Sequence, residues 1–312
     1  VTPIHGLREY HFGEWEGLTF KQIAKHWPDI SVDFFKNPDA VMSNIVKVTE
    51  HIRKKLKAAG KDETRGTLNV IFTHDGHFSY TDKQGNYWRS YDYIQNVSTF
   101  QLCESVEMFY KVGLAFGNFQ SQLADFDASV LYDTIPNFHN TENRYENFEK
   151  ALSADVCNRA KDIAEEIKFV TDRKEICSYI NKGVANKTLP LRVTHNDTKL
   201  NNILIDGEGI CIIDLDTVML GSVLCDFGDA IRSGASSALE DETDLSKVYM
   251  RLDMFDSLAK GFIEGLTGSL SEAEILSMPM GAIIITFETG MRFLTDYLSG
   301  DTYFKIDYPQ HN

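Results

Sequence analysis

The stretch from Leu191 to Asp216, LRVTHNDTKLNNILIDGEGICIIDLD, constrains the fold of this chain more than any other part of the sequence. Its apolar start predicts a strand, and the polar residues that follow predict a loop. Two more apolar runs, separated by glycines, predict a hairpin of short strands with its turn at Gly207-Glu208-Gly209. This order holds the polar residues of the loop and the end of the hairpin in a fixed relation.

The polar residues of this stretch are those that phosphoryl transfer needs. Asp197 can accept the proton of an attacking hydroxyl or orient that hydroxyl, and Lys199 places a cation beside the transferred group. Asn202 and Asp214 offer a neutral and an anionic oxygen, which together suit Mg²⁺ on ATP. The alternative is a polar loop without chemistry. The hairpin that ends at Asp214 favours catalysis, because it adds a second requirement that a chance match would have to meet.

Other polar residues nearby are given supporting roles. We expect His195 to brace the loop. Asp226-Phe227-Gly228 spells the metal motif of protein kinases, but it follows a predicted loop at Gly221-Ser222 and not the hairpin. Asp214 therefore has the better context for the metal. Asp226 and Asp229 are interpreted as structural, either capping a helix or bracing the catalytic loop. Asp216 is an open alternative for metal or substrate contact.

Helical and strand patterns surround the central stretch. Asn37-Pro38 predicts a helix start, and apolar residues at spacings of three and four continue that helix to residue 59. A strand over 68–72 and a hairpin turned at Gly85-Asn86 follow. Glycines at 113, 117, 281 and 290 predict close helix packing or a bend. The remaining helices are expected at about 106–123, 141–152, within 154–186, and at 246–266 and 271–299.

Composition excludes several classes of protein. The net charge of −15 argues against nucleic acid or an anionic membrane as the main partner. The longest strongly apolar run, 278–285, is too short to span a bilayer. The five cysteines form no C-x-x-C pair, which favours reduced thiols and a cytoplasmic location.

Three blocks make the chain similar to a known family. THNDTKLNNILID, IIDLDTVM and DFGDAIR resemble the aminoglycoside phosphotransferase/choline kinase group of protein-kinase-like folds. Within that group they are most similar to the N-acetylhexosamine 1-kinases, and the similarity runs from about residue 35 onward. The resemblance implies an α+β, protein-kinase-like fold of two lobes. The expected N-terminal lobe is truncated, and the C-terminal lobe is mainly helical.

The resemblance also implies an activity and a set of site residues. The expected reaction is ATP- and Mg²⁺-dependent phosphorylation of the anomeric hydroxyl of N-acetylglucosamine or N-acetylgalactosamine. Asp197 matches the catalytic aspartate, and Asn202 and Asp214 match the metal positions. The hinge that binds the nucleotide would include Tyr91, Tyr93 and Ile94. Arg292 and Tyr303 match sugar-binding residues, and His139 is a weaker candidate for the same sugar-binding site.

The N-terminal residues depart from this family. LREYHFGEWEG resembles a segment of the histidine phosphatase family, but the nucleophilic histidine motif of that family is absent. We therefore expect a phosphatase-like remnant without activity over 1–34, a partial kinase N-lobe and hinge over 35–97, and a C-lobe over 98–312. Because the glycine-containing hairpin over the ATP phosphates is missing from its place, we expect weakened turnover.

Two other functions stay open from the sequence. A kinase of the same chemistry could act on choline, an aminoglycoside or another small hydroxyl compound. A choline-type site would want aromatic and acidic residues around a cation, which nothing in the sequence requires. A kinase-fold remnant could also bind sugar without catalysis.

Overall fold

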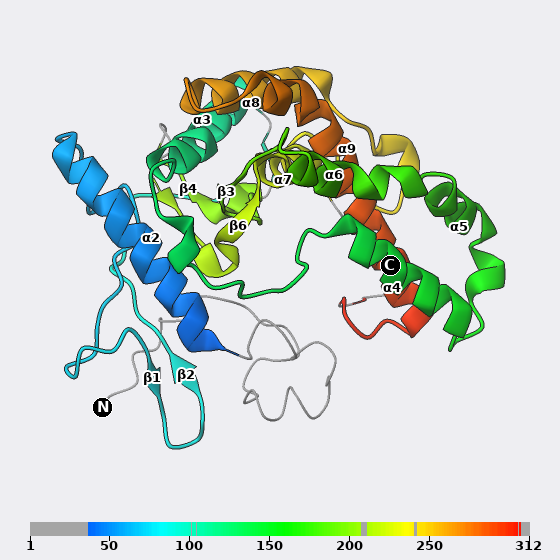
Figure 1. Cartoon of the computed structure of the whole chain (residues 1–312), viewed down its shortest axis with the longest axis horizontal. Helices are drawn as coiled ribbons and strands as arrows, with labels where there is room; N and C mark the ends of the chain where they lie inside the picture. The colour runs from blue at the N-terminus through cyan, green and yellow to red at the C-terminus, as the bar shows by residue number, and fades with distance from the viewer. Residues whose placement is uncertain are drawn as a thin grey trace.

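The computed structural model describes residues 37–100, 102–103, 105–206, 211–239, 242–304 and 306. Within these residues the chain mixes helices with three small antiparallel sheets of two strands each, so the predicted α+β class is confirmed. The predicted phosphatase-like segment at 1–34 and the turn at Gly207-Glu208-Gly209 lie outside the described residues. Figure 1 shows the helix-rich part of the chain beside α2 and a β-hairpin.

The first described helix is α2, Pro38–Ala58. The Asn37 side chain accepts a hydrogen bond from the Ala40 amide (3.1 Å), and Pro38 occupies the first turn. The apolar residues at spacings of three and four are buried as predicted, and they are Val41, Ile45, Val48, Ile52 and Leu56.

A short hairpin follows, made of β1, Tyr80–Thr81, and β2, Tyr87–Trp88. The predicted strand at 68–72 is wrong as a full strand. It is reduced to one antiparallel bridge between Val70 and Tyr91, and the side chains of Ile71 and Phe72 are exposed. Within the described residues it has no partner on its other side, which leaves the pairing too limited to extend.

Helices α3, Val106–Gln122, and α8, Leu252–Gly265, lie side by side in Figure 1. They approach closely because glycines face backbone in both directions. A Cβ built on Gly113 would lie 2.3 Å from the Leu258 carbonyl oxygen, and one on Gly261 would lie 2.0 Å from the Tyr110 carbonyl oxygen. The predicted small-residue strip on α3 is therefore confirmed, and α8 carries a matching strip.

The predicted start of α8 at residue 246 is wrong. Only a 3₁₀ turn, Leu245–Lys247, precedes the helix. Met250 then bridges Ser236, and the Arg251 amide donates to the Ala235 carbonyl at 2.8 Å. These tertiary bonds hold the segment extended, so the helix begins at Leu252.

Helix α9, Glu272–Ser299, starts with a capping box between Ser271 and Glu274. It packs on α7, Val223–Gly234, and on α4, Thr141–Ala154. Helix α5, Ala164–Thr171, adds to a second apolar cluster between α4 and α9. The remaining helical segments are α6 (Tyr179–Ala185) and the 3₁₀ turns Ala128–Val130, Ala160–Asp162, Lys174–Ser178, Leu200–Asn202 and Leu215–Thr217.

The central stretch forms the strands that the sequence predicts, and a further strand that the sequence does not predict follows it. β3, Leu191–Thr194, precedes the polar loop, and β4, Ile203–Leu204, pairs with β5, Cys211–Ile212. The predicted loop at Gly221-Ser222 is instead part of β6, Met219–Ser222, which pairs antiparallel with β3. Gly221 permits this pairing, because a Cβ there would lie 2.3 Å from the Thr194 hydroxyl.

No described helix combines the length and the apolar character that a bilayer crossing requires.

Candidate active site

The backbone of the β4–β5 hairpin brings the two predicted metal positions together. The Ile213 amide donates to the Asn202 carbonyl at 2.9 Å, which extends the pairing by one step beyond the two strands. Asn202, at the start of the hairpin, therefore lies across from the end where Asp214 follows Ile213. Asp214 adopts a left-handed backbone with φ of 57°, which turns the chain away from the strand.

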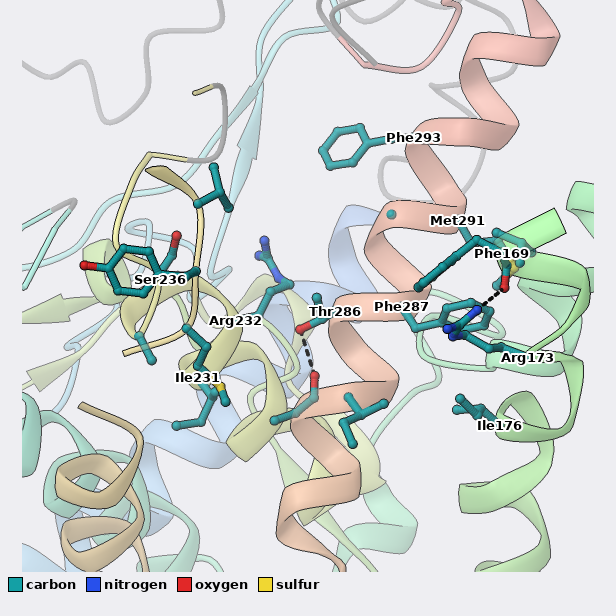
Figure 2. A pocket seen from close by; sticks show the side chains of 18 of the residues that line it. Phe169, Arg173, Ile176, Ile231, Arg232, Ser236, Thr286, Phe287, Met291 and Phe293 are labelled. Carbon is teal, nitrogen blue, oxygen red and sulfur yellow. Dashed lines mark hydrogen bonds between the residues drawn. The ribbon is translucent and has the colours of Figure 1, made fainter. Parts of the chain in front are cut away.

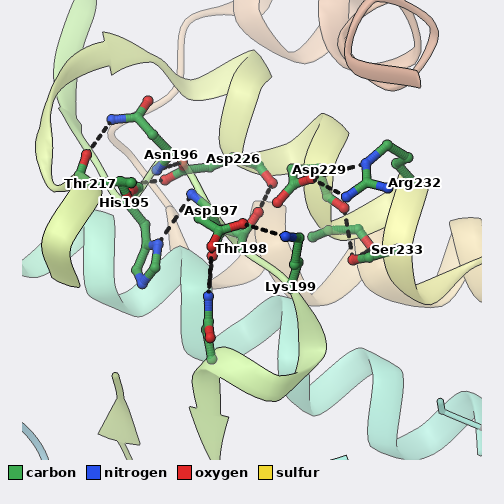
Figure 3. A network of polar contacts seen from close by, with 12 residues as sticks. His195, Asn196, Asp197, Thr198, Lys199, Thr217, Asp226, Asp229, Arg232 and Ser233 are labelled. Atoms are coloured by element: carbon green, nitrogen blue, oxygen red, sulfur yellow. Dashed lines mark hydrogen bonds and ion pairs between the residues drawn. The ribbon is translucent and has the colours of Figure 1, made fainter. Parts of the chain in front are cut away.

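The Asp197 carboxylate lies next to two of the predicted site residues, of which Figure 3 labels Lys199. The Asn202 amide nitrogen donates to Asp197 Oδ2 at 3.2 Å and to the Asp197 carbonyl at 2.8 Å. The Lys199 ammonium lies 3.4 Å from Asp197 Oδ1. The Asp197 side chain is 27% exposed and the Lys199 side chain is 43% exposed, so a ligand from solvent can reach both.

These contacts fix the orientation of the Asn202 amide. Both of its partners on Asp197 can only accept hydrogen bonds, so Nδ2 must face them. Oδ1 is then left as a neutral oxygen ligand, and Asp214 is a half-buried carboxylate at the same end of the hairpin. One amide oxygen and one carboxylate fit Mg²⁺, which keeps several water or phosphate ligands of its own. No cluster of three acidic, histidine or cysteine ligands occurs within the described residues.

His195 is fully buried and supports the loop from the protein interior. Its Nε2 lies 2.9 Å from the Ile213 carbonyl, and its Nδ1 accepts from the Asp197 amide at 3.2 Å. One bond needs a donor and the other an acceptor, so the ring is the neutral tautomer with its proton on Nε2. His195 therefore links the loop to the hairpin.

Asp226 lies in the first turn of α7, whose N-cap is Ser222 and not Asp226. Its carboxylate accepts from the amides of His195 (3.0 Å) and Asn196 (2.7 Å), and from the Gln120 side chain (2.6 Å). Burial raises the pKa of Asp226, while the N–H donors act in the opposite direction by stabilising the carboxylate. Of the two structural roles expected from the sequence, the geometry is that of a loop brace.

One turn further along α7, Asp229 pairs with Arg232 (Figure 3). Asp229 Oδ1 accepts from Nη2 of Arg232 at 3.0 Å and from Nε at 3.1 Å. Asp229 Oδ2 is buried and has no hydrogen-bond partner among the described residues. The pair extends the polar network from the catalytic loop along α7.

Asp216, left open as a metal or substrate residue, is bound by an arginine of the N-terminal part. Arg89 donates from Nη1 to Asp216 Oδ1 at 2.6 Å and from Nη2 to Oδ2 at 2.9 Å. Close by, Asn44 of α2 donates to the Val218 carbonyl at 3.0 Å. These bonds join α2 and the residue that follows β2 to the segment that carries Asp214.

The predicted nucleotide hinge connects the β1–β2 hairpin to α3. Tyr93 is 86% exposed, whereas Ile94 is buried. Ser98, further along, exchanges two backbone hydrogen bonds with Ile205, which directly follows β4. Tyr91 is half-buried, and its ring lies under the Arg89 guanidinium at 5.7 Å. The hinge thus lies beside the hairpin that carries Asn202.

The predicted acceptor residues Arg292 and Tyr303 lie together at the end of α9. Arg292 Nη2 donates to the Tyr303 hydroxyl at 3.3 Å, and its guanidinium lies 5.6 Å from the tyrosine ring centre. Asp296, one turn along the helix, is buried and accepts the backbone amides of Thr302, Tyr303 and Phe304 at 2.7–2.9 Å. Asp296 therefore fixes the loop that presents Tyr303.

His139, the third predicted acceptor residue, is mostly buried. Its two ring nitrogens contact the Glu288 carboxylate at 2.9 Å and the Asn196 carbonyl at 2.8 Å. In this arrangement both nitrogens are occupied by protein atoms. The contacts connect α9 to the residue just before Asp197.

A large cavity of about 1210 Å³ lies between α5, α7 and α9 (Figure 2). Its wall is mainly apolar, with Phe169, Phe287, Met291 and Phe293 from α5 and α9. None of the catalytic-loop residues lines it. It approaches the polar network only through Arg232, so we place the candidate active site at the loop and not in this cavity.

Sequence reasoning missed several residues that hold this site. Glu288 carried a signal, because it is a single acid within the apolar run AIIITFETGMRF of a predicted helix. Buried acids in such runs are usually paired. Arg89 follows the predicted hairpin turn at Gly85-Asn86, but the sequence indicates no partner for it, and Asn44 and Asp296 have no local signal.

Comparison with known proteins identifies the family. A sequence profile of the phosphotransferase enzyme family matches residues 88–255, which is more than half of the 312 residues. The chain belongs to the phosphotransferase enzyme family. The matched range of this family contains the whole catalytic loop, both hairpin strands and α7.

A second profile, that of the histidine phosphatase superfamily (branch 1), matches residues 1–80. This match runs past the predicted boundary at residue 34 and covers α2, so the boundary remains a prediction.

Two solved structures of phosphotransferases are similar to the chain. A microcompartment-associated aminopropanol kinase is 12% identical, with a TM-score of 0.47, over 82% of this chain and 79% of that one. An aminoglycoside phosphotransferase from Alicyclobacillus acidocaldarius subsp. acidocaldarius DSM 446 is 10% identical, with a TM-score of 0.40, over 85% and 84%.

Proposed function

We propose that this phosphotransferase is a sugar 1-kinase that transfers the γ-phosphoryl group of ATP to the anomeric hydroxyl of N-acetylhexosamines. The main support is the Asp197 carboxylate, which is accessible to solvent and held between Asn202 and Lys199. The sugar specificity rests on the resemblance of the surrounding blocks to N-acetylhexosamine 1-kinases.

The catalytic loop supplies the chemistry of the proposed transfer. Asp197 accepts the hydrogen bond of the attacking hydroxyl and takes its proton as the new P–O bond forms, while the bond from the γ-phosphorus to the bridging oxygen breaks and ADP leaves. Lys199, beside the same carboxylate, stabilises the negative charge on the transferred group. Asn202 and Asp214 would hold Mg²⁺, which when bound neutralises charge on the phosphates of ATP.

The acceptor and the nucleotide are assigned to the two sides of this loop. Arg292 offers a fork of donors and Tyr303 a ring with a hydroxyl, and both suit a ligand with many hydroxyl groups. The hinge at Tyr91, Tyr93 and Ile94 is assigned to adenine. Among the described residues, the amides of Tyr93 and Ile94 donate no hydrogen bond, so they can serve a ligand.

The proposed arrangement is a kinase-like pair of lobes with a truncated N-terminal lobe. The described N-terminal part consists of α2, the β1–β2 hairpin and the hinge, and neither strand is followed by a glycine-rich loop over the catalytic residues. We therefore expect ATP to bind weakly and turnover to be slow. A kcat/KM in the normal range of sugar 1-kinases would contradict this expectation.

The test is a product assay with N-acetylglucosamine, N-acetylgalactosamine and Mg-ATP. Sugar 1-phosphate should form, and Asp197→Asn should lower kcat by about 10²–10⁴-fold, the usual contribution of a catalytic base. Asp172→Asn, on the surface next to α5, is the control and should leave the rate unchanged. Equal product from Asp197→Asn and the wild type would overturn the assignment.

The alternative functions are separated by the same reagents. Phosphorylation of choline or an aminoglycoside, with none of the sugars, would keep the chemistry and replace the acceptor. A rise in melting temperature with a sugar, but none with Mg-ATP and no product, would indicate a sugar-binding protein without catalysis.

A further inference from the structure

His139 makes two hydrogen bonds that join distant parts of the chain. It lies just before α4, and its side chain is 12% exposed. Nδ1 lies 2.9 Å from Glu288 Oε1 on α9, and Nε2 lies 2.8 Å from the Asn196 carbonyl in the catalytic loop. The ring thus spans the space between α9 and the loop.

The chemistry of the two partners determines the charge of the ring. A carboxylate and a carbonyl oxygen can only accept hydrogen bonds, so both ring nitrogens must donate. A histidine with two N–H groups is an imidazolium ion. Its counterion, Glu288, is 1% exposed, and the second carboxylate oxygen accepts from the Thr141 hydroxyl at 2.6 Å. The pair is therefore buried with its hydrogen bonds satisfied, which makes a buried charge tolerable.

The other charged groups around the pair also favour a positively charged His139 and a negatively charged Glu288. Burial alone would lower the pKa of His139, but the Glu288 carboxylate and the Asn196 carbonyl act against burial, and the pKa is raised. Asp229 of α7 adds to this effect, and on the other side Arg144 of α4 helps to lower the pKa of Glu288. The nearby Cys225 thiol has a pKa raised by burial and stays neutral.

The contact with Asn196 acts on the peptide group that leads into Asp197. A peptide unit is planar, so its carbonyl and its amide turn together. The carbonyl of this unit accepts from His139, and its amide, which belongs to Asp197, donates to His195 at 3.2 Å. Asn196 has a left-handed backbone with φ of 66°, which needs support from its surroundings.

We propose that His139, charged and paired with Glu288, is a positioning residue that orients the peptide unit before Asp197 and with it the Asp197 carboxylate. This rests on the proposed function in so far as Asp197 is the catalytic group. It replaces a sugar contact for His139, because both ring nitrogens already serve the loop and α9.

The first experiment tests the charged pair without any substrate. In protein labelled with ¹⁵N-histidine, His139 should show two protonated ring nitrogens at neutral pH, assigned by loss of the signal in His139→Gln. A neutral single tautomer would overturn the proposal. In Glu288→Gln the ring should become neutral, because the amide can donate to Nδ1 while Nε2 still donates to Asn196.

The second experiment tests positioning through the Asp197 amide. Its hydrogen exchange should be at least about tenfold faster in His139→Ala, because the peptide unit loses one of its two supports. It should change little in Glu288→Gln, which keeps both hydrogen bonds. The control is His51→Ala on α2, whose ring contacts Asp125 and not the catalytic loop. Unchanged exchange in a folded His139→Ala protein would refute a positioning role.

Kinetics complete the test and separate it from the proposed function. In His139→Ala, kcat per folded molecule should fall by about 10–100-fold with KM for ATP nearly unchanged, because a misplaced carboxylate affects the transfer step. Glu288→Gln, which keeps both hydrogen bonds of the ring, should retain most of the wild-type rate. If the wild type phosphorylates no sugar, the proposed function fails. The histidine labelling and the hydrogen exchange still test whether His139 positions the peptide unit before Asp197. Loss of stability with an unchanged kcat would leave His139 purely structural.

Discussion

At the scale of single residues, the candidate site depends on unusual backbone at two positions. Asn196, beside the proposed catalytic carboxylate, and Asp214, a predicted metal ligand, both have positive φ. Such a conformation costs about 1–2 kcal/mol in residues other than glycine. Asparagine and aspartate tolerate it best, because their short side chains bond to nearby backbone.

Asn196 therefore both makes side-chain hydrogen bonds and tolerates a left-handed backbone, and substitutions can separate these two contributions. Its side chain accepts from the Thr194 hydroxyl at 2.9 Å and donates to the Thr217 carbonyl at 3.0 Å. Asn196→Ala should lower the free energy of unfolding by about 2–4 kcal/mol, since it loses these bonds and keeps the strain. Asn196→Gly loses the bonds only and should cost less. Equal losses in urea denaturation would show that backbone strain contributes nothing.

The pH dependence of stability should report on His139 and Glu288. The raised pKa of His139 gives stability that is complete below its usual value of 6.5 and is lost as pH rises through the folded pKa. The lowered pKa of Glu288 gives stability that is present above its usual value of 4.5 and is lost as pH falls through the folded pKa. Between pH 4.5 and pH 6.5, the free energy of unfolding of the wild type should therefore be about 2 kcal/mol higher than that of Glu288→Gln. In alkaline solution the difference should be smaller.

The measurement is denaturation of both proteins across this pH range. A difference that grows with rising pH above 6.5 would contradict the charge assigned to His139.

At the scale of elements, close helix contacts set the positions of the loop supports. α7 carries Asp226 and α9 carries Glu288, and the two helices meet through Gly228 and Gly281. A Cβ on Gly281 would lie 2.6 Å from the Leu224 carbonyl oxygen. The distance between these helices is therefore set by backbone contact.

Two glycines of α9 make a matched test of this contact. Gly281→Ala should lower the free energy of unfolding by about 3 kcal/mol, because backbone must move to admit the methyl group. Gly290→Ala, where an added Cβ meets nothing within 4 Å, should gain about 0.5–1 kcal/mol from helix propensity. Thermal or urea denaturation compares the two, and similar losses would argue against backbone contact as the cause.

At the scale of the whole molecule, a few polar bonds join the N-terminal part to the catalytic part. The bidentate pair of Arg89 and Asp216 is the main one, with side chains 19% and 10% exposed. Asn44 adds bonds to the Val218 and Tyr132 carbonyls. Because Asp216 lies two residues beyond Asp214, these bonds also orient the predicted metal ligand.

Removing the Arg89 side chain should lower the stability of the protein and weaken binding at the predicted metal site. Arg89→Ala leaves a largely buried carboxylate without its cation, which should lower the free energy of unfolding by about 2–4 kcal/mol. Mg-ATP should also bind more weakly, as isothermal titration would show. Arg251→Ala, which breaks the exposed pair with Asp253, is the control and should change little. A double-mutant cycle with Asp216→Ala assigns the effect to the pair.

Agreement between sequence and structure is best where the pattern is local. The start of α2 at Asn37-Pro38, the helix expected at 271–299 and the β4–β5 hairpin follow from signals within a few residues. Agreement is poorest where a long-range partner decides. β6 forms because β3 lies beside it, and α8 starts late because Arg251 bonds to Ala235.

The sequence by itself determined the family, the polar loop and the types of side chain that a phosphoryl-transfer site needs, because these depend on short spacings along the chain. The sequence also indicated His195 as a support of the loop, but only the tertiary structure decided between the two roles of Asp226 and added supports that the sequence did not suggest. Asp226 reaches the loop from α7 and His139 from the segment before α4, and Arg89 reaches the metal segment from the N-terminal part. Hydrogen bonds between such distant residues depend on packing of whole helices and leave no local pattern to recognise.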